Sequence, residues 1–180
     1  MRYLNYIIIN ILFSLIIGCN DNEKDNLPKM RTVDYVDLKR FMGDWFVIAN
    51  IPTFIEKNAT NAVESYSMGD NGEVKTNFTF FQNYPHGKKK VYKPTGYIHN
   101  TDTNAEWRMQ FLWPFKMPFL IIDLDKQYQY TVIGYPNRKY LWIMSRNPEM
   151  DSNLYNSIID QLSKKGFDIS KIKKVTQIWD

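Results

Sequence analysis

The residues that could perform chemistry are few and scattered along this chain. It holds one cysteine, Cys19, and two histidines, His86 and His99, neither of which has a metal-ligand spacing. No Gly-x-Ser-x-Gly elbow, phosphate-binding loop or dinucleotide fingerprint occurs. Asp123 and Asp125 form an acidic pair, but paired carboxylates alone do not make a hydrolase. The pattern therefore predicts a protein that is not an enzyme and has neither a cofactor nor a metal site.

Cys19 ends a segment with the character of an export signal. Arg2 supplies a positive start, and the mostly apolar run 7–17 is too short for a confident membrane span. The string LIIGC at 15–19 resembles the bacterial lipobox, which implies removal of residues 1–18 and acylation of Cys19. The alternative is an ordinary signal peptide that contains a cysteine by chance.

Acylation of Cys19 predicts a membrane-anchored protein without a disulfide. Several acyl chains anchor firmly, whereas a single chain is marginal. Asn20, and not an aspartate, follows the cysteine, which favours the outer membrane, and we expect the domain to face the periplasm. Residues 19–32 are polar without periodicity and predict a lipidated tether. Residues 33–180 then form one domain whose stability comes from packing alone.

The composition is that of one ordinary globular domain. Of 180 residues, 44% are hydrophobic and 16% aromatic, and Tyr and Phe favour strands. The formal net charge is +4, carried in part by Lys88, Lys89 and Lys90. A solvated surface explains such lysines, and attraction to anionic lipid headgroups is the alternative. No predicted helix concentrates Arg and Lys on one face, so nucleic acid is not an expected partner.

Short strand-like runs separated by turn signals predict an all-β fold with one flanking helix. The runs are 45–50, 62–68, 73–82, 90–99, 105–113, 118–124, 128–134 and 139–145. Eight consecutive strands joined by short hairpins favour an antiparallel up-and-down β-barrel, which removes exposed edges.

The last predicted barrel strand is apolar on both faces and therefore needs a cover. Residues 152–165 follow it with apolar side chains at helical spacing, after a capping Asp151 and before Gly166. We expect this helix to lie outside the barrel. A helical turn over 37–41 and a short final strand over 172–177 complete the prediction.

Three motifs in order along the chain resemble those of the lipocalin family. They are Gly43-Asp44-Trp45, then Asp123-Leu124-Asp125 at a turn, then a final strand motif that ends with Arg146. The similarity covers residues 34–177 and points to the branch that contains bacterial lipocalins and apolipoprotein D. It implies a lipocalin barrel that binds lysophospholipids or fatty acids and helps to maintain the bacterial membrane under stress.

Physical chemistry suggests structural roles for the motif residues. Trp45 can plug one end of a barrel with a large apolar body. Arg146 can lie across its indole face, and its guanidinium can bond backbone carbonyls of the opening turn. We therefore assign a structural role, and not a role in ligand binding, to the motif residues Gly43, Trp45, Asp123, Asp125 and Arg146.

Alternation along the predicted strands selects side chains for the inside of the barrel. The predicted ligand-binding residues are Val47, Ala49, Glu64, Tyr66, Met68, Val74, Thr76, Phe78, Trp107, Met109, Phe111, Phe119, Ile121, Tyr140 and Trp142. Glu64 and Tyr66 point to the same face of their strand. Related sequences of the bacterial lipocalin branch usually have a small residue at the position of Glu64. An inward Glu64 would disfavour a ligand carboxylate nearby and tolerate a zwitterionic or cationic headgroup, whereas the alternative places it at the wet rim.

Two further functions stay open at this point. An enzyme acting on lipid would need a buried reactive group, and Glu64 with Tyr66 is the constellation to test. A purely structural tethered domain would have a barrel filled by its own side chains. The sequence also leaves a homodimer open.

Overall fold

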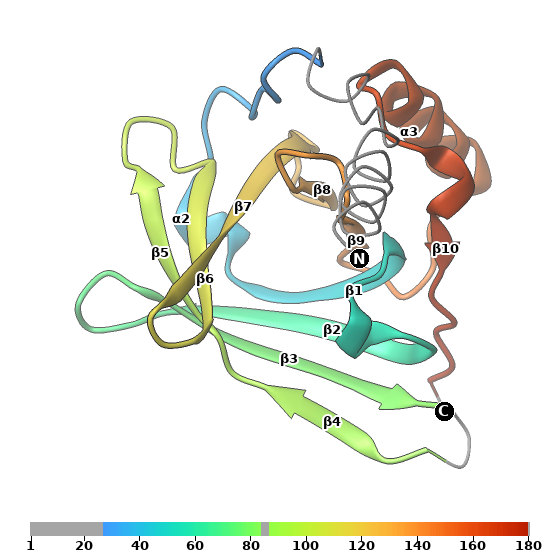
Figure 1. The fold of residues 1–180 in the computed structure, drawn as a ribbon, viewed down its shortest axis with the longest axis horizontal. Helices are drawn as coiled ribbons and strands as arrows, with labels where there is room; N and C mark the ends of the chain where they lie inside the picture. The colour runs from blue at the N-terminus through green and yellow to red at the C-terminus, as the bar shows by residue number, and fades with distance from the viewer. Residues whose placement is uncertain (1–26, 84–86, 180) are drawn as a thin grey trace, which may run out of the picture.

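Eight antiparallel strands form a closed ring in the computed structural model (Figure 1). Each strand pairs with its neighbour along the ring, and the last pairs with the first through five residue pairs from Phe46–Ser145 to Ile51–Leu141. The strands are β1 Gly43–Ile51, β2 Ala59–Met68, β3 Val74–Gln82, β5 Thr95–Asn100, β6 Glu106–Leu112, β7 Phe115–Leu124, β8 Tyr130–Gly134 and β9 Leu141–Ser145. Closure removes the two edges that an open sheet would expose, and the predicted fold class is confirmed.

The structure describes residues 27–83 and 87–179 of the chain. The predicted leader, Cys19 and His86 lie outside these residues. Near the start of the described part, Met30 is buried against the barrel wall and the carbonyl of Pro28 accepts a hydrogen bond from Arg138. The last residues of the predicted tether therefore pack on the domain. Among the described residues, no helix combines the length and apolar character needed to cross a bilayer.

The predicted strand over 90–99 is wrong as a single element. Two strands occupy it, β4 Lys89–Tyr92 and β5, with Lys93 and Pro94 between them. Both strands pair with β3. Strand β4 pairs along Phe78–Phe81, and β5 pairs at Val74 and Lys75. Proline has no backbone N–H to donate to a ladder, so Pro94 interrupts the strand.

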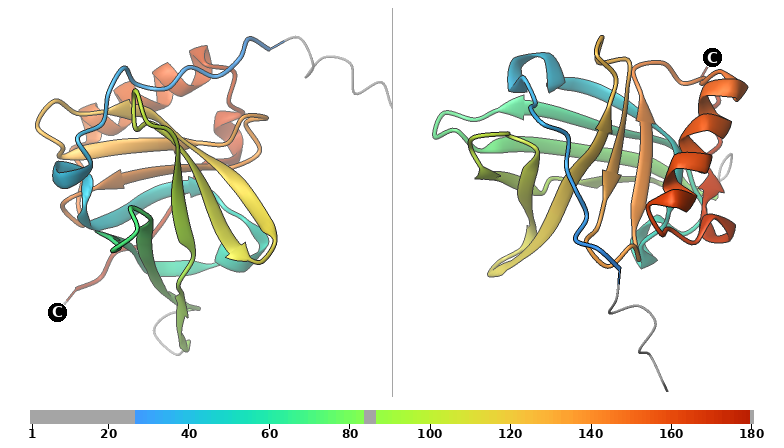
Figure 2. Two further views of the ribbon diagram at one scale, coloured as in Figure 1. Left: turned by 90° about the vertical axis from the view of Figure 1, so that its left-hand side faces the viewer. Right: turned by 90° about the horizontal axis from the view of Figure 1, so that it is seen from above.

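Helix α3 (Ser152–Lys164) lies against the outside of the barrel, as the sequence predicts (Figure 2). The side chain of Asp151 caps it by accepting hydrogen bonds from the backbone N–H groups of Asn153 and Leu154. Its buried residues Ile158 and Leu162 pack with outward-facing residues of the wall, including Leu120, Ile122, Val132, Leu141 and Ile143. This outer cluster is separate from the core inside the barrel.

A bulge in β1 decides which core receives its side chains. The pairing of β1 with β9 shifts register between Val47 and Ala49. Because a one-residue shift exchanges the two faces of a strand, Val47 belongs to the inner core and Ala49 to the outer cluster under α3. The prediction that Ala49 faces the inside of the barrel is wrong for this reason.

The remaining elements cover the ends and one side of the barrel. Helix α2 (Leu38–Phe41) stands at the predicted helical turn, and the 3-10 helix η1 (Phe54–Glu56) follows β1. After α3, the 3-10 helix η2 (Ile169–Lys171) leads into β10 (Lys173–Lys174), which pairs with β1. The predicted final strand over 172–177 is thus only two residues long. Beyond it, the Gln177 side chain donates hydrogen bonds to the carbonyls of Val47 and Ala62.

Candidate functional site

One end of the barrel is sealed by Trp45. Its side chain is fully buried, and its indole Nε1 donates a hydrogen bond of 2.8 Å to the carbonyl of Phe41 in α2. The guanidinium carbon of Arg146 lies 3.7 Å from the centre of the indole ring. Gly43 has a φ of +94°, and a Cβ there would approach Arg146 Nη1 to 3.3 Å. Glycine at this position therefore allows the arginine to lie across the tryptophan.

Arg146 also ties the strand end to the opening segment. Its two terminal nitrogens donate hydrogen bonds of 2.7 to 3.1 Å to the carbonyls of residues 40, 41, 42 and 44. Charge-assisted bonds of this kind are stronger than neutral ones. Burial is the main cause that lowers the pKa of Arg146 from its ordinary value. These contacts close the floor of the barrel around Trp45.

The acidic pair organises a turn. The carboxylate of Asp125 accepts hydrogen bonds from the backbone N–H groups of Gln127 and Gln129. Asp123 is half-buried, and burial is the main cause that raises its pKa. No group of three or more His, Cys, Asp or Glu side chains suited to a metal ion occurs among residues 27–83 and 87–179.

Aromatic rings fill the half of the barrel next to this floor. Trp107 stacks on Phe119 with ring centres 5.3 Å apart. Tyr66 meets Trp107 edge to face at 5.7 Å, and Phe41 packs on Trp45 at 5.1 Å. Of the predicted ligand-binding residues, five are buried in this packed half without lining a cavity: Val47, Tyr66, Val74, Trp107 and Ile121. They stabilise the barrel and do not reach its hollow part.

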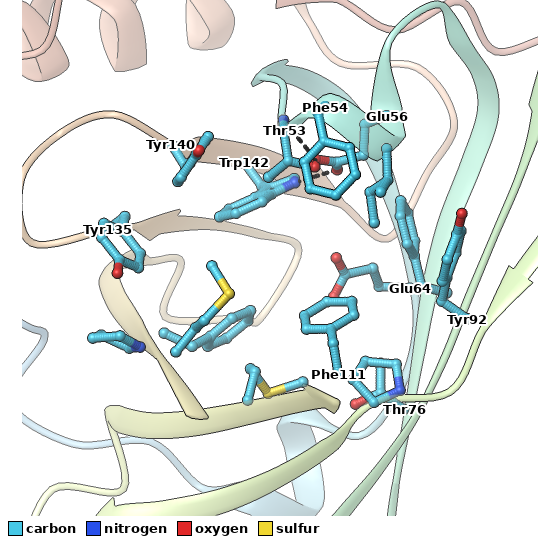
Figure 3. Close-up of a pocket in the computed structure, with 17 residues that line it drawn as sticks. Thr53, Phe54, Glu56, Glu64, Thr76, Tyr92, Phe111, Tyr135, Tyr140 and Trp142 are labelled. Carbon is cyan, nitrogen blue, oxygen red and sulfur yellow. Dashed lines mark hydrogen bonds between the residues drawn. The ribbon is translucent and has the colours of Figure 1, made fainter. Parts of the chain in front are cut away.

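The opposite half of the barrel contains a cavity of about 300 Å³ (Figure 3). Eight of the predicted residues line it: Glu64, Thr76, Phe78, Met109, Phe111, Phe119, Tyr140 and Trp142. Its size is at the lower end of the range for small-molecule sites, and its wall is mostly apolar as such sites usually are. Met68 is not part of it, because it lies 42% exposed at the far end of β2. The prediction that Met68 lines the ligand cavity is therefore also wrong.

Sequence reasoning missed about half of the cavity lining, including Tyr92, Pro94 and Pro118 on expected strands and six residues that lie off them. Nine more side chains line the cavity: Thr53, Phe54, Ile55, Glu56, Tyr92, Pro94, Met117, Pro118 and Tyr135. Thr53 and η1 cover the mouth, and Tyr135 follows β8. The capping box from Thr53 to Glu56 was a local signal for η1, but nothing local places η1 over a barrel.

The tip of the β6–β7 hairpin carries exposed apolar side chains beside the mouth. Leu112 is 71% exposed and Trp113 81% exposed, and Phe115 is similarly open. Phe111, half-exposed on the same hairpin, lines the cavity. The apolar surface of the cavity therefore continues onto the outside of the protein.

Two buried acidic side chains, Glu56 and Glu64, line this mostly apolar cavity. The Glu64 side chain points into it from β2, as Figure 3 shows, and Tyr66 donates its hydroxyl hydrogen to Glu64 Oε2. Burial chiefly, and the negative charge of Glu56 to a lesser degree, raise the pKa of Glu64 to about 7. Burial likewise raises the pKa of Tyr66 well above its ordinary value, so the phenol is a donor at neutral pH. An inward Glu64, and not a rim position, is what the structure shows.

Glu56 is held in a different way. Its Oε1 accepts a hydrogen bond of 2.6 Å from the indole of Trp142. Its Oε2 accepts bonds of 2.9 and 2.6 Å from the backbone N–H and hydroxyl of Thr53. Glu56 thus fastens η1 to β9 across the mouth. Its carboxylate has donors on both oxygens, in contrast to that of Glu64.

A closed antiparallel barrel that is solid at one end and hollow at the other defines a small-ligand-binding β-barrel. This chain belongs to the lipocalin family, because the model of a lipocalin-like domain matches residues 36–177. Members of this family are in general carriers of small hydrophobic ligands rather than enzymes.

Several known proteins are similar to this chain over most of its length. The outer membrane lipoprotein Blc of Escherichia coli K12 is 26% identical over 178 residues, which cover 98% of both chains. Temperature-induced lipocalin-1 of Arabidopsis thaliana is 27% identical over 83% of both, and mouse apolipoprotein D is 25% identical over 83% of this chain and 82% of its own. Among solved structures, insecticyanin of the tobacco hornworm Manduca sexta aligns with a TM-score of 0.64 and 20% identity over 82% of this chain and 84% of its own.

Proposed function

We propose that this protein is a carrier of single-chain lipids in the bacterial envelope, where it binds a lysophospholipid or a fatty acid and helps to maintain the membrane. The observation that carries the proposal is the cavity of about 300 Å³ inside the barrel, with an apolar wall and a mouth beside η1. Each methylene buried there contributes about 0.8 kcal/mol. A long chain therefore reaches micromolar affinity with few polar contacts, after the costs of association.

The proposal includes a lipid anchor at Cys19 and a location on the outer membrane, facing the periplasm. It is supported by the lipobox-like string that ends at Cys19 and by relatives named outer membrane lipoproteins at 22% to 26% identity. The test is metabolic labelling with radioactive palmitate followed by membrane fractionation. We expect label and outer-membrane recovery for the full chain and neither for Cys19→Ser. Label that persists in Cys19→Ser would contradict the anchor.

Lipid binding is tested by native mass spectrometry of the delipidated domain that begins at residue 19 and carries Cys19→Ser. We expect one bound molecule per chain when a lysophospholipid is added at micromolar concentration. Met109→Trp should abolish that species, because the indole would occupy the cavity that Met109 lines.

Met68→Trp is the matched control, because the same substitution there lies outside the cavity. We expect it to bind lipid as the unsubstituted domain does. The same spectra report whether the domain is a monomer or a homodimer. Absence of any lipid-bound species in the unsubstituted domain would contradict the proposal and favour a barrel that serves only as a tethered structure.

A further inference from the structure

The polar groups inside the cavity are not those that a carboxylate ligand needs. Two acidic side chains, Glu56 and Glu64, are among the lining residues, and each is less than 10% exposed. The described residues that line the cavity include no Lys, Arg or His. A buried carboxylate without a cation nearby is costly, so the charge pattern inside this cavity calls for an explanation.

Only one of the two acids is required by the fold. Glu56 has donors on both oxygens and holds η1 to β9. Glu64 accepts one hydrogen bond among the described residues, from Tyr66, and this bond goes to Oε2. Its Oε1 therefore remains open to a donor brought by a ligand.

A second polar atom in the cavity also lacks a partner. Thr76 is 5% exposed, and its hydroxyl oxygen has no hydrogen-bond partner within the described part of the chain. Glu64 pairs with Phe78 across the β2–β3 ladder, and Tyr66 pairs with Thr76. Glu64 and Thr76 are thus diagonal neighbours on the inner face, close enough to meet one ligand group. Buried polar atoms are normally satisfied, and a ligand donor would satisfy both.

Aromatic side chains surround these two polar groups. The cavity that Glu64 and Thr76 line is also lined by Phe78, Tyr92, Phe111 and Trp142 (Figure 3). Aromatic faces attract cations, and the attraction grows where water is excluded. Carboxylate and aromatic faces together are suited to an ammonium group, whereas a second carboxylate would meet like charge at close range.

We propose that this cavity selects amphiphiles whose inserted polar group is an ammonium, with Glu64 as its counter-ion and Thr76 as a second acceptor. The inference rests on the proposed function and narrows its ligand class. The ammonium donates one hydrogen to Glu64 Oε1 and another to the Thr76 hydroxyl, and the alkyl chain lies along the apolar wall. A fatty acid of the same length lacks these donors and carries the opposite charge.

The test compares dodecylamine, dodecanol and dodecanoate, which share one chain and differ in the charge of the head. Binding is measured by calorimetry at about pH 8, where the amine is protonated and the acid is ionised. We expect dodecylamine to bind at least about tenfold more tightly than dodecanoate, because a hydrogen bond to a charged group commonly contributes that much. Dodecanol should lie between them.

Glu64→Gln keeps the size of the side chain and an acceptor for Tyr66 but removes the charge. We expect the amine and the carboxylate to bind this variant within about threefold of each other, because the charged partner is lost. Unchanged dodecanol affinity in the same variant shows that the cavity is intact. Glu149→Gln, an exposed position before α3, is the charge-matched control and should keep the preference for the amine.

The outcomes separate this inference from the proposal on which it rests. Dodecanoate binding as tightly as dodecylamine, or an amine preference that survives Glu64→Gln, would overturn the ammonium site while lipid binding stands. Failure of all three ligands to bind the unsubstituted protein would overturn both.

Discussion

The burial of Glu64 predicts that the protein loses stability as the pH rises from about 4.5 to about 7. The pKa of Glu64 is about 7 in the folded protein, compared with 4.5 for the free side chain. The folded state therefore holds this proton more tightly than the unfolded state does. Below about pH 4.5 both states are protonated, and between the two pKa values only the folded state keeps the proton. The free energy of unfolding falls across that window and levels off above it.

The size of the effect follows from the shift. Each pKa unit corresponds to about 1.4 kcal/mol, so a rise from 4.5 to about 7 removes about 3 kcal/mol of stability by pH 8. This is a large share of the free energy of unfolding of an ordinary domain, about 5–15 kcal/mol. Glu64→Gln cannot ionise and keeps the contact with Tyr66. It should match the original protein near pH 4 and exceed its stability by about 3 kcal/mol near pH 8.

The assay is urea unfolding followed by tryptophan fluorescence at several pH values between these limits. The difference between the protein and Glu64→Gln isolates Glu64, because all other titrating groups are common to both. Glu149→Gln should follow the original protein at every pH. A difference between the protein and Glu64→Gln that stays constant over the whole range would refute the reasoning, since it would mean that ionised Glu64 is as well solvated in the barrel as in water.

Two other expectations concern the framework. Arg146→Lys should lower the free energy of unfolding by about 3 kcal/mol, because a lysine replaces neither the flat contact with Trp45 nor the hydrogen bonds to four carbonyls. Urea unfolding measures this loss. A loss below about 1 kcal/mol would contradict the role given to Arg146. Leu162→Ala should lower the free energy of unfolding by about 2–5 kcal/mol, because it leaves a void under α3. The affinity for dodecanol should not change, because that cluster lies outside the barrel. A lower dodecanol affinity, measured by calorimetry, would show that the two cores are coupled.

Local chemistry predicted most of the framework. Asp151 and the apolar spacing after it indicate α3, and the turn signals separate the strands with their antiparallel order. Pro94 is a local signal as well, and its missing N–H should have divided the predicted strand over 90–99. Each of these features depends on neighbours within a few residues, so a sequence pattern can indicate it.

Local sequence patterns did not indicate the position of the bulge in β1. Alternation places Ala49 with Val47, but the pairing with β9 shifts register between them. A bulge belongs to two strands that are distant in the sequence, so neither strand alone shows it. The same shift moves Ala49 from the inner core to the cluster under α3.

By itself, the sequence determined the inward parity of Glu64 and Tyr66 and the apolar character of their neighbours, because side chains alternate along any strand. Only the tertiary structure decided their depth. Trp45 and Arg146 form the floor, and aromatic side chains fill the barrel from there up to Tyr66. Glu64 is the next residue of β2 on the same face, two positions away, and it lines the hollow half. Depth along a barrel depends on how all eight strands are staggered and on what closes the ends. Parity, in contrast, is a property of one strand.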